Sequence, residues 1–177
     1  MNSKPFDNFE IIDCGSITLS GISENLKLEA VGLLLSTNNP QARRFLERCP
    51  SNMDESMDVI SKMISSFHAK TSLTFTIKLK TAGTIGFIIV HTPSNSTDIK
   101  DWLLEYHLAD MYWGKGIMSV CLQNVLLFLK NNQVQSVKAV VDYENLPSKR
   151  ILEKFGFEYY TENQLLDKVV YELILNN

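Results

Sequence analysis

The chain has 177 residues, of which 45% are hydrophobic and 21% are charged, and this composition excludes disordered and fibrous proteins. A chain of this length buries roughly 70% of the surface that its unfolded form exposes. We therefore expect a single domain over residues 1–177. The 20 acidic residues outnumber the 17 basic ones, and a net charge of -3 argues against a nucleic-acid partner.

The three cysteines, Cys14, Cys49 and Cys121, form no Cys-x-x-Cys pair, which favours a reducing compartment and predicts no metal site. Residues 1–7 do not have the pattern of a secretory signal. No segment approaches the roughly 20 apolar residues that a membrane span requires. We expect a cytoplasmic protein with no membrane partner, and the sequence does not indicate an oligomeric state.

Apolar periodicity over the first third of the chain predicts one strand followed by three helices. The strand lies within Phe9–Ser20, with a possible bend at Gly15. Helical spacing then marks Leu26–Leu34, Pro40–Arg48 and Met53–Phe67.

Strands dominate the middle of the chain. Alternating patterns predict strands over Leu73–Lys80, Gly83–His91 and Ile99–Leu108, separated by a Gly-containing turn and a polar loop. Three strands in succession indicate an antiparallel meander.

The last third of the chain predicts a strand, a buried helix and a second strand. Gly114 opens the most apolar helix of the chain, which runs to Asn131 and must pack against a sheet. Together with the flanking strands it predicts a right-handed βαβ crossover. The elements that follow the helix are a strand over Val137–Tyr143, a helix over Asn145–Phe155 and a hairpin of Phe157–Tyr160 with Val169–Leu175.

A strand that leads into a glycine-bearing loop at a helix start, over residues 104–117, is typical of an anion site. Gly114 and Gly116 allow a bound group to approach the backbone, and the amides of the first helical turn point outward. A pyrophosphate suits such a loop. The alternative is that Gly-Lys-Gly is only a tight turn, because short glycine patterns also occur without a ligand.

The second informative stretch covers residues 142–157. Asn145 is placed as the N-cap of a helix, with Pro147 in its first turn and Gly156 as the left-handed residue after its end. This local structure explains the stretch without a ligand, so Asn145 alone favours a capping role.

The two stretches together resemble the GNAT superfamily of acetyl-CoA-dependent N-acetyltransferases. The resemblance rests on Tyr-Trp-Gly-Lys-Gly-Ile-Met in the loop and Asn-Leu-Pro-Ser-Lys-Arg-Ile-Leu-Glu-Lys-Phe-Gly-Phe some thirty residues later. It covers about Leu73–Leu175 and is strongest to the branch of ribosomal-protein N-terminal alanine and serine acetyltransferases. It implies an α/β (α+β) fold with a mixed, mostly antiparallel sheet that is splayed at its centre and flanked by helices.

The resemblance also implies where acetyl-CoA binds, with the pantetheine arm in the splay between the strands that end at Leu108 and Tyr143. Backbone groups near Leu108 would pair with this arm, Asn145 would contact it from the other side, and Ser148 would hydrogen-bond the departing thiolate. The remaining residues implied in cofactor binding hold the pyrophosphate through their amides, namely Met111, Trp113, Gly114, Lys115, Gly116, Ile117 and Met118.

Direct attack of an amine on a thioester requires a neutral nucleophile, a donor for the developing oxyanion and a proton for sulfur. Strand alternation places Leu103, Glu105 and His107 on one face. Glu105 is the first candidate for the base, although the glutamate of the family corresponds to Leu103. His107 is the second candidate, since it is neutral near pH 7.

We therefore expect an acyltransferase that moves the acetyl group of acetyl-CoA to a primary amine, with a protein or peptide N-terminus as the favoured acceptor. A small-molecule amine, such as a polyamine, an amino sugar or an antibiotic, is the first alternative. The second alternative is a CoA-binding regulatory module without catalysis, because Val120 and Leu152 replace acidic and tyrosine residues of relatives.

Overall fold

The computed structural model describes residues 2–46, 49–93, 101–163 and 167–175, which form an eight-stranded sheet in the order β1-β2-β3-β4-β5-β6-β8-β7. Neighbouring strands are antiparallel except for β5 and β6, which are parallel. The strands are β1 (Ile12–Cys14), β2 (Ile17–Ser20), β3 (Ser72–Leu79), β4 (Gly83–His91), β5 (Leu103–Leu108), β6 (Ser136–Asp142), β7 (Glu158–Asn163) and β8 (Lys168–Ile174).

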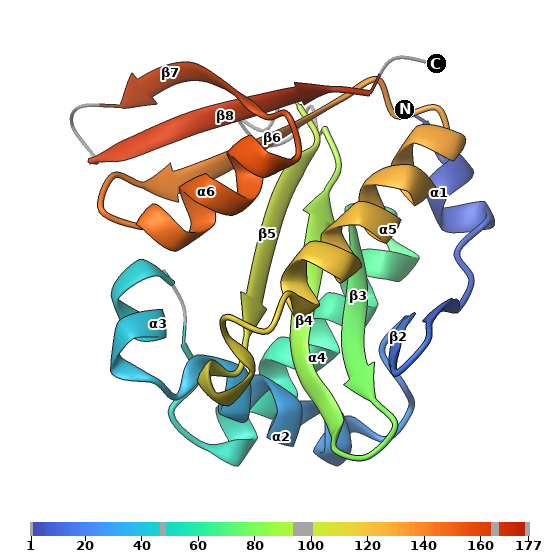
Figure 1. Cartoon of the computed structure of the whole chain (residues 1–177). Coiled ribbons are helices and arrows are strands. Elements are labelled where there is room, and N and C mark those ends of the chain that lie inside the picture. The colour runs from blue at the N-terminus through green and yellow to red at the C-terminus, as the bar shows by residue number, and fades with distance from the viewer. Residues whose placement is uncertain (1, 47–48, 94–100, 164–166, 176–177) are drawn as a thin grey trace.

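Helices cover both faces of the sheet (Figure 1). On one face α5 crosses the central strands and α6 lies on the C-terminal strands, while α2 and α4 pack on the other face. The helices are α1 (Lys4–Asp7), α2 (Leu26–Thr37), α3 (Pro40–Phe45), α4 (Met53–His68), α5 (Ile117–Asn131) and α6 (Leu146–Lys154), with a 3-10 turn η1 at Asp110–Tyr112. None of the described helices is long and apolar enough to cross a membrane.

Two hydrophobic clusters fill these layers. The larger lies under α5, which contributes Cys121, Leu122 and Leu129, all fully buried. The smaller joins Ala30 and Leu33 of α2 to Ile60 of α4 and Phe87 of β4. The expected burial of the apolar helix against a sheet is thus confirmed, and the antiparallel meander of β3, β4 and β5 and the βαβ unit β5-α5-β6 are confirmed as well.

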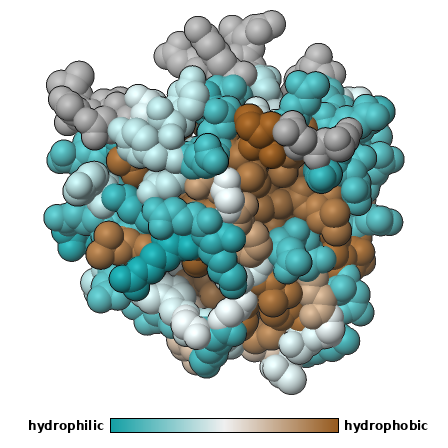
Figure 2. All heavy atoms as spheres, turned by 45° about the horizontal axis from the view of Figure 1, so that its top comes forward, coloured by the Kyte–Doolittle hydropathy of each residue, from teal (hydrophilic) through white to brown (hydrophobic). Residues whose placement is uncertain are grey.

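Hydrophobic side chains also reach the surface. Figure 2 shows them gathered on the right of the view, whereas its left half is mostly hydrophilic. On α5, Val120 and Leu127 are exposed on the outer side of the helix.

The structure corrects the predicted start of the sheet. Instead of one bent strand, residues 12–20 form the antiparallel hairpin of β1 and β2. Gly15 has φ +84°, in the left-handed region that glycine tolerates, and its amide donates to Oδ1 of Asp13. The chain therefore reverses at Gly15. The short helix α1 was not predicted, because four residues carry no periodic signal.

Two later boundaries also differ from the prediction. The strand expected from Ile99 begins at Leu103, and residues 99 and 100 lie outside the described part of the chain. The apolar helix begins at Ile117 instead of Gly114. Both Gly114 and Gly116 have positive φ, so neither belongs to a right-handed helix.

A buried carboxylate fixes α2 on the sheet. Glu29 has no exposed surface and accepts hydrogen bonds from Lys78 of β3, Thr84 of β4 and the amide of Ser23. Burial alone would raise the pKa of Glu29, but these hydrogen bonds outweigh it and lower the pKa. Gly32 lies one turn further along α2, where a Cβ would be 2.6 Å from Thr84, so the helix and strand are in close contact.

We predict that Gly86→Ala destabilises the pairing of β4 with β5. Gly86 pairs in register with Leu108, and a Cβ at Gly86 would lie 2.5 Å from the carbonyl oxygen of His107. The strands must separate to accommodate it, at a cost of about 1–3 kcal/mol in the free energy of unfolding. Urea denaturation measures this loss.

The matched control is Gly15→Ala, where a Cβ meets nothing within 4 Å and the positive φ is the source of strain. Its cost should be smaller, at about 1 kcal/mol. Equal losses in the two variants would contradict the close contact at Gly86.

Candidate active site

The parallel strands β5 and β6 pair at one position and then separate. All of β5, from Leu103 to Leu108, pairs with β4. With β6, Leu103 pairs with Lys138, whose amide donates to the carbonyl of Trp102. Figure 1 shows the two strands diverging beyond this point. The splay at the centre of the sheet, implied by the family resemblance, is therefore present.

The open edge of β5 presents backbone groups to this splay. The amide of Ala109 donates to Ile85 of β4, and successive residues of a strand point their backbone groups to opposite edges. The N–H and C=O groups of Leu108 therefore face β6. Nε1 of Trp113 donates to the carbonyl of Leu108 at 2.6 Å, which folds the indole back against the strand end and leaves the amide of Leu108 for a ligand.

The glycine-bearing loop lies at the open end of the splay. The amides of Met111, Tyr112 and Trp113 are used within the turn, where they donate to Asp110 or Ala109. By contrast, the amides of residues 114–119 donate to no group in the described part of the chain. The predicted set of amides, which began at Met111, is thus narrowed to those from Gly114 onward.

This loop fits a pyrophosphate. Gly114 and Gly116 have φ of +69° and +75°, and a Cβ at either glycine would meet nothing within 4 Å, so the space beside the backbone is open. The first turn of α5 adds the positive end of the helix dipole. Lys115 is exposed and its Nζ lies 5.5 Å from the centre of the Tyr112 ring. Met111 is exposed, while the side chain of Met118 belongs to the core.

The opposite side of the splay is formed by the start of α6. Oδ1 of Asn145 accepts from the amide of Ser148 at 3.2 Å, so the predicted N-cap is confirmed. The Nδ2 group of Asn145 donates to no group of the described residues and is available to a ligand.

Tyr106 of β5 spans the splay. Its hydroxyl donates to the carbonyl of Ser148 at 3.3 Å, which ties the central strand to the first turn of α6. Burial raises the pKa of Tyr106 to about 12, against the smaller opposite effect of this hydrogen bond. The phenol therefore remains protonated and keeps donating. The sequence did not single out this residue.

Glu105 and His107 share one face of β5, as strand alternation predicted, and His107 contacts α2 on that face. Oε1 of Glu105 lies 3.2 Å from Nε2 of His91, and the Glu105 side chain is 63% exposed. The contact with His91 lowers the pKa of Glu105. The carboxylate is therefore a weak base that already has a partner.

His107 is held more tightly. Its Nδ1 lies 2.9 Å from Oγ of Ser36 on α2, and its ring packs against Phe87 with 5.3 Å between the ring centres. Burial lowers the pKa of His107 to about 4, and the negative charge of Glu105 opposes the shift. The imidazole is neutral at pH 7.

The helix α3 connects both sides of the splay. Asn39, which caps α3, donates to Asp110 on the β5 side, and Arg44 forms an ion pair with Glu144 on the β6 side. Figure 1 shows α3 beside the opening, below α6. The approach to the splay from this direction is thus bordered by α3.

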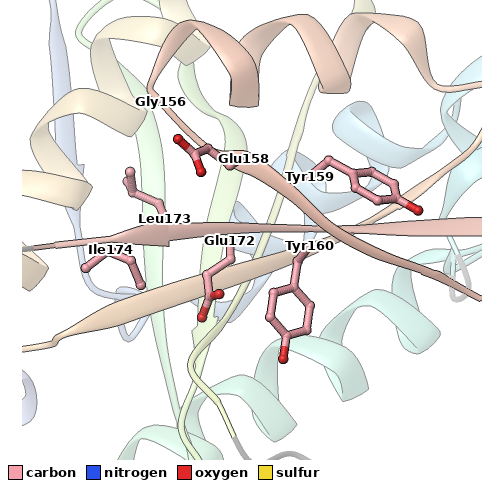
Figure 3. Close-up of a pocket in the computed structure, with 7 residues that line it drawn as sticks. All are labelled: Gly156, Glu158, Tyr159, Tyr160, Glu172, Leu173 and Ile174. Atoms are coloured by element: carbon pink, nitrogen blue, oxygen red, sulfur yellow. The ribbon is translucent and has the colours of Figure 1, made fainter.

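A separate hollow of about 290 Å³ lies on the hairpin of β7 and β8 (Figure 3). Tyr160 and Glu172 point to the same side of the hairpin in that view. Lys138 lies between this hollow and β5, with Nζ 3.9 Å from the Tyr160 ring centre and 3.9 Å from the Glu172 carboxylate. Because β8 and β7 lie beyond β6, this hollow is distinct from the splay.

Comparisons with known proteins place the chain in a family. Residues 18–158 match the family model described as an acetyltransferase (GNAT) domain. A search of curated protein sequences found no match. Solved structures with the same fold include three acetyltransferases.

A ribosomal L7/L12 alpha-N-protein acetyltransferase in complex with coenzyme A has a TM-score of 0.78 at 17% identity, and the alignment covers 93% of this chain and 98% of that one. The ribosomal-protein-S5-alanine acetyltransferase from Vibrio fischeri has a TM-score of 0.78 at 12% identity, and the alignment covers 95% of this chain and 98% of that one. The microcin C7 self-immunity acetyltransferase, bound to acetyl-CoA and AMP, has a TM-score of 0.75 at 18% identity, and the alignment covers 90% of this chain and 92% of that one.

The splayed sheet, the free amides at the start of α5 and the match over residues 18–158 agree with one another. The chain belongs to the GNAT acetyltransferase family and is an acetyl-CoA-dependent N-acetyltransferase.

Proposed function

We propose that this protein transfers the acetyl group of acetyl-CoA to the α-amino group of a protein or peptide N-terminus, acting as a single domain in the cytoplasm. The observation that carries the proposal is the splay between β5 and β6, which opens onto amides 114–119. The three cysteines are free in the structure, which agrees with a reducing compartment.

The residues around the splay are suited to hold acetyl-CoA, which supplies the activated acetyl thioester. The amides of Gly114, Lys115, Gly116, Ile117 and Met118 would bind the pyrophosphate, and the helix dipole would add to their attraction. The amide of Leu108 and the Nδ2 group of Asn145 would contact the pantetheine arm from the two sides of the splay. Met111 and Trp113 contribute by shaping the loop, since their amides are used within it.

Ser148 and His107 have the two proton-transfer roles in this proposal. The Ser148 hydroxyl would donate to the departing sulfur from the first turn of α6. His107 would accept the proton of the attacking amine from the α2 face of β5, and Glu105 would contribute negative charge beside it. Glu105 is the weaker candidate for the base, because its carboxylate is partnered by His91.

The weakness of both bases supports an α-amine as the acceptor. The pKa of His107 is lowered to about 4 and that of Glu105 is lowered from its ordinary value. Neither group can efficiently deprotonate a lysine, whose neutral form costs about 4.6 kcal/mol at pH 7, whereas an α-amine with a pKa near 8 costs only about 1.4 kcal/mol. Two of the similar structures are acetyltransferases of ribosomal proteins, and one of them is described as an alpha-N-protein acetyltransferase.

The test is an acceptor panel with purified protein and acetyl-CoA, in which release of free thiol is measured. The panel contains peptides with free N-termini, the same peptides with blocked N-termini and one internal lysine, polyamines, amino sugars and amine antibiotics. We expect turnover with free N-termini and at least about 100-fold less with the blocked lysine peptides. Turnover confined to small amines would support the first alternative, and CoA binding with no turnover would support a regulatory module.

We predict that Gly116→Val strongly weakens CoA binding. Gly116 is the N-cap of α5 with φ +75°, and a side chain there would occupy the open space beside the amides. The dissociation constant measured by isothermal titration calorimetry should rise by about 100-fold.

The control is Gly15→Val, a variant with the same strain at φ +84° but in the hairpin of β1 and β2. It should bind CoA as the native protein does. Native affinity in Gly116→Val would overturn the proposed position of the pyrophosphate.

We predict that Ser148→Ala lowers kcat by roughly 10- to 100-fold and leaves the affinity for CoA unchanged. The cap of α6 uses the amide of Ser148, not its hydroxyl, so the helix should remain folded. Circular dichroism checks the fold and steady-state kinetics give kcat. An unchanged kcat would show that the sulfur takes its proton from elsewhere.

A further inference from the structure

We propose that Ser36 fixes His107 in the tautomer that carries its proton on Nδ1, so that Nε2 has a lone pair free to accept a proton from the acceptor amine. Ser36 is a positioning residue, which acts through the imidazole. The inference rests on the proposed function, because it assigns how the base of that site is oriented. The sequence did not predict a role for Ser36.

The hydroxyl of Ser36 is buried on α2, where the residue is 1% exposed. Its Oγ lies 3.0 Å from the carbonyl oxygen of Leu33 and 2.9 Å from Nδ1 of His107. The contact with Leu33 is a hydrogen bond in which Ser36 is the donor, because a carbonyl oxygen has no hydrogen to give. The hydroxyl hydrogen of Ser36 is therefore directed to Leu33.

This leaves a lone pair of Ser36 facing His107. Since a hydroxyl has one hydrogen, the 2.9 Å contact is a hydrogen bond only if Nδ1 is the donor. A neutral imidazole has one N–H group, so Nε2 is then unprotonated. The relay runs from Nδ1 of His107 to Oγ of Ser36 and on to the carbonyl of Leu33.

His107 is half-buried, and its Nε2 has no partner among the described residues. Nε2 of His107 forms no hydrogen bond to the described residues, so its lone pair is not used within this part of the chain. An acceptor without a partner at the end of β5, one residue before Leu108, is placed where an amine would approach the splay.

The surroundings hold this arrangement in place. The ring of Phe87 packs beside the imidazole, and Glu29 anchors α2 through Lys78 and Thr84. The helix that carries Ser36 is therefore fixed against the strands next to His107. Burial keeps the ring neutral, which preserves the lone pair on Nε2.

The proton balance is simple. The neutral amine nitrogen would bond to the carbonyl carbon of the thioester as the C=O π pair moves to oxygen, and the amine proton would move to Nε2, which gives an imidazolium with protons on both nitrogens. Re-formation of the carbonyl then expels the sulfur. The C–S bond breaks with its electron pair on sulfur, which takes a proton from Ser148. Nε2 then releases its proton to water and Ser148 takes a proton from water, so both groups return to their starting states, while Nδ1–H remains bonded to Ser36 throughout.

The direct test is the tautomer of His107, read from long-range ¹H–¹⁵N NMR spectra of the whole protein. The chain has three histidines, so a His107→Gln variant assigns the signal. We expect Nδ1 to have the chemical shift of a protonated nitrogen and Nε2 that of an unprotonated one at pH 7. The reverse pattern would overturn the proposal, whether or not the protein acetylates peptides.

Kinetics provide the second measurement, with Ser36→Ala compared with Thr37→Ala. Thr37 is the matched control, since it is equally buried on α2 and its hydroxyl also donates to Leu33, at 2.8 Å, but it has no bond to His107. We expect Ser36→Ala to lower kcat by about 10- to 100-fold, the range found when the hydrogen-bond partner of a metal-binding histidine is removed, and to shift the His107 tautomer.

Thr37→Ala should keep the native tautomer and most of the native kcat, and both variants should bind CoA as the native protein does. Equal losses of kcat in the two variants, or a native tautomer in Ser36→Ala, would overturn the role of Ser36. Failure of the native protein to acetylate any peptide would instead reject the proposed function, and the NMR result would stand apart from it.

Discussion

The separation of β5 from β6 is the constraint on which the rest of the structure depends. After the pair of Leu103 with Lys138, the edge of β5 that faces β6 has no strand partner in the described part of the chain. Backbone N–H and C=O groups that have no neighbouring strand within a sheet need other hydrogen-bond partners. The carbonyl of Leu108 finds one in the indole of Trp113, and Tyr106 bridges to α6 through its side chain. The amide of Leu108 is left for an extended ligand that lies between the strands.

The candidate catalytic groups lie on the two opposite faces of β5. On one face, the hydroxyl of Tyr106 contacts Ser148 in the first turn of α6, and the free amides at the start of α5 lie at the open end of the splay. On the other, His107 and Glu105 meet the residues of α2 and His91. A cosubstrate bound in the splay would therefore have its sulfur on the side of α6 and its carbonyl accessible from the side of α2. The amine can then approach from the face opposite to the departing thiolate.

The elements of the fold were largely predictable, because the apolar pattern of long segments such as α4, α5 and β4 indicates both the type of element and its burial. The reversal at Gly15 was underestimated, since a glycine within an alternating pattern indicates a bend and a hairpin equally well. Within the site, the glycine loop and the cap at Asn145 each depend on residues that are close together in the sequence, so both could be predicted from the sequence. The contacts of Ser36 with His107 and of Tyr106 with Ser148 join residues 71 and 42 positions apart, and no local pattern reports such pairs.

The central claim is that a CoA pyrophosphate binds the amides at the start of α5. The most direct measurement is a titration of uniformly ¹⁵N-labelled protein with CoA, followed through the backbone amide signals. The account predicts that the largest shifts fall on residues 114–119 and on Leu108, at the two ends of the splay. It is contradicted if CoA saturates the protein while these signals stay in place and the large shifts occur at the β7 and β8 hairpin.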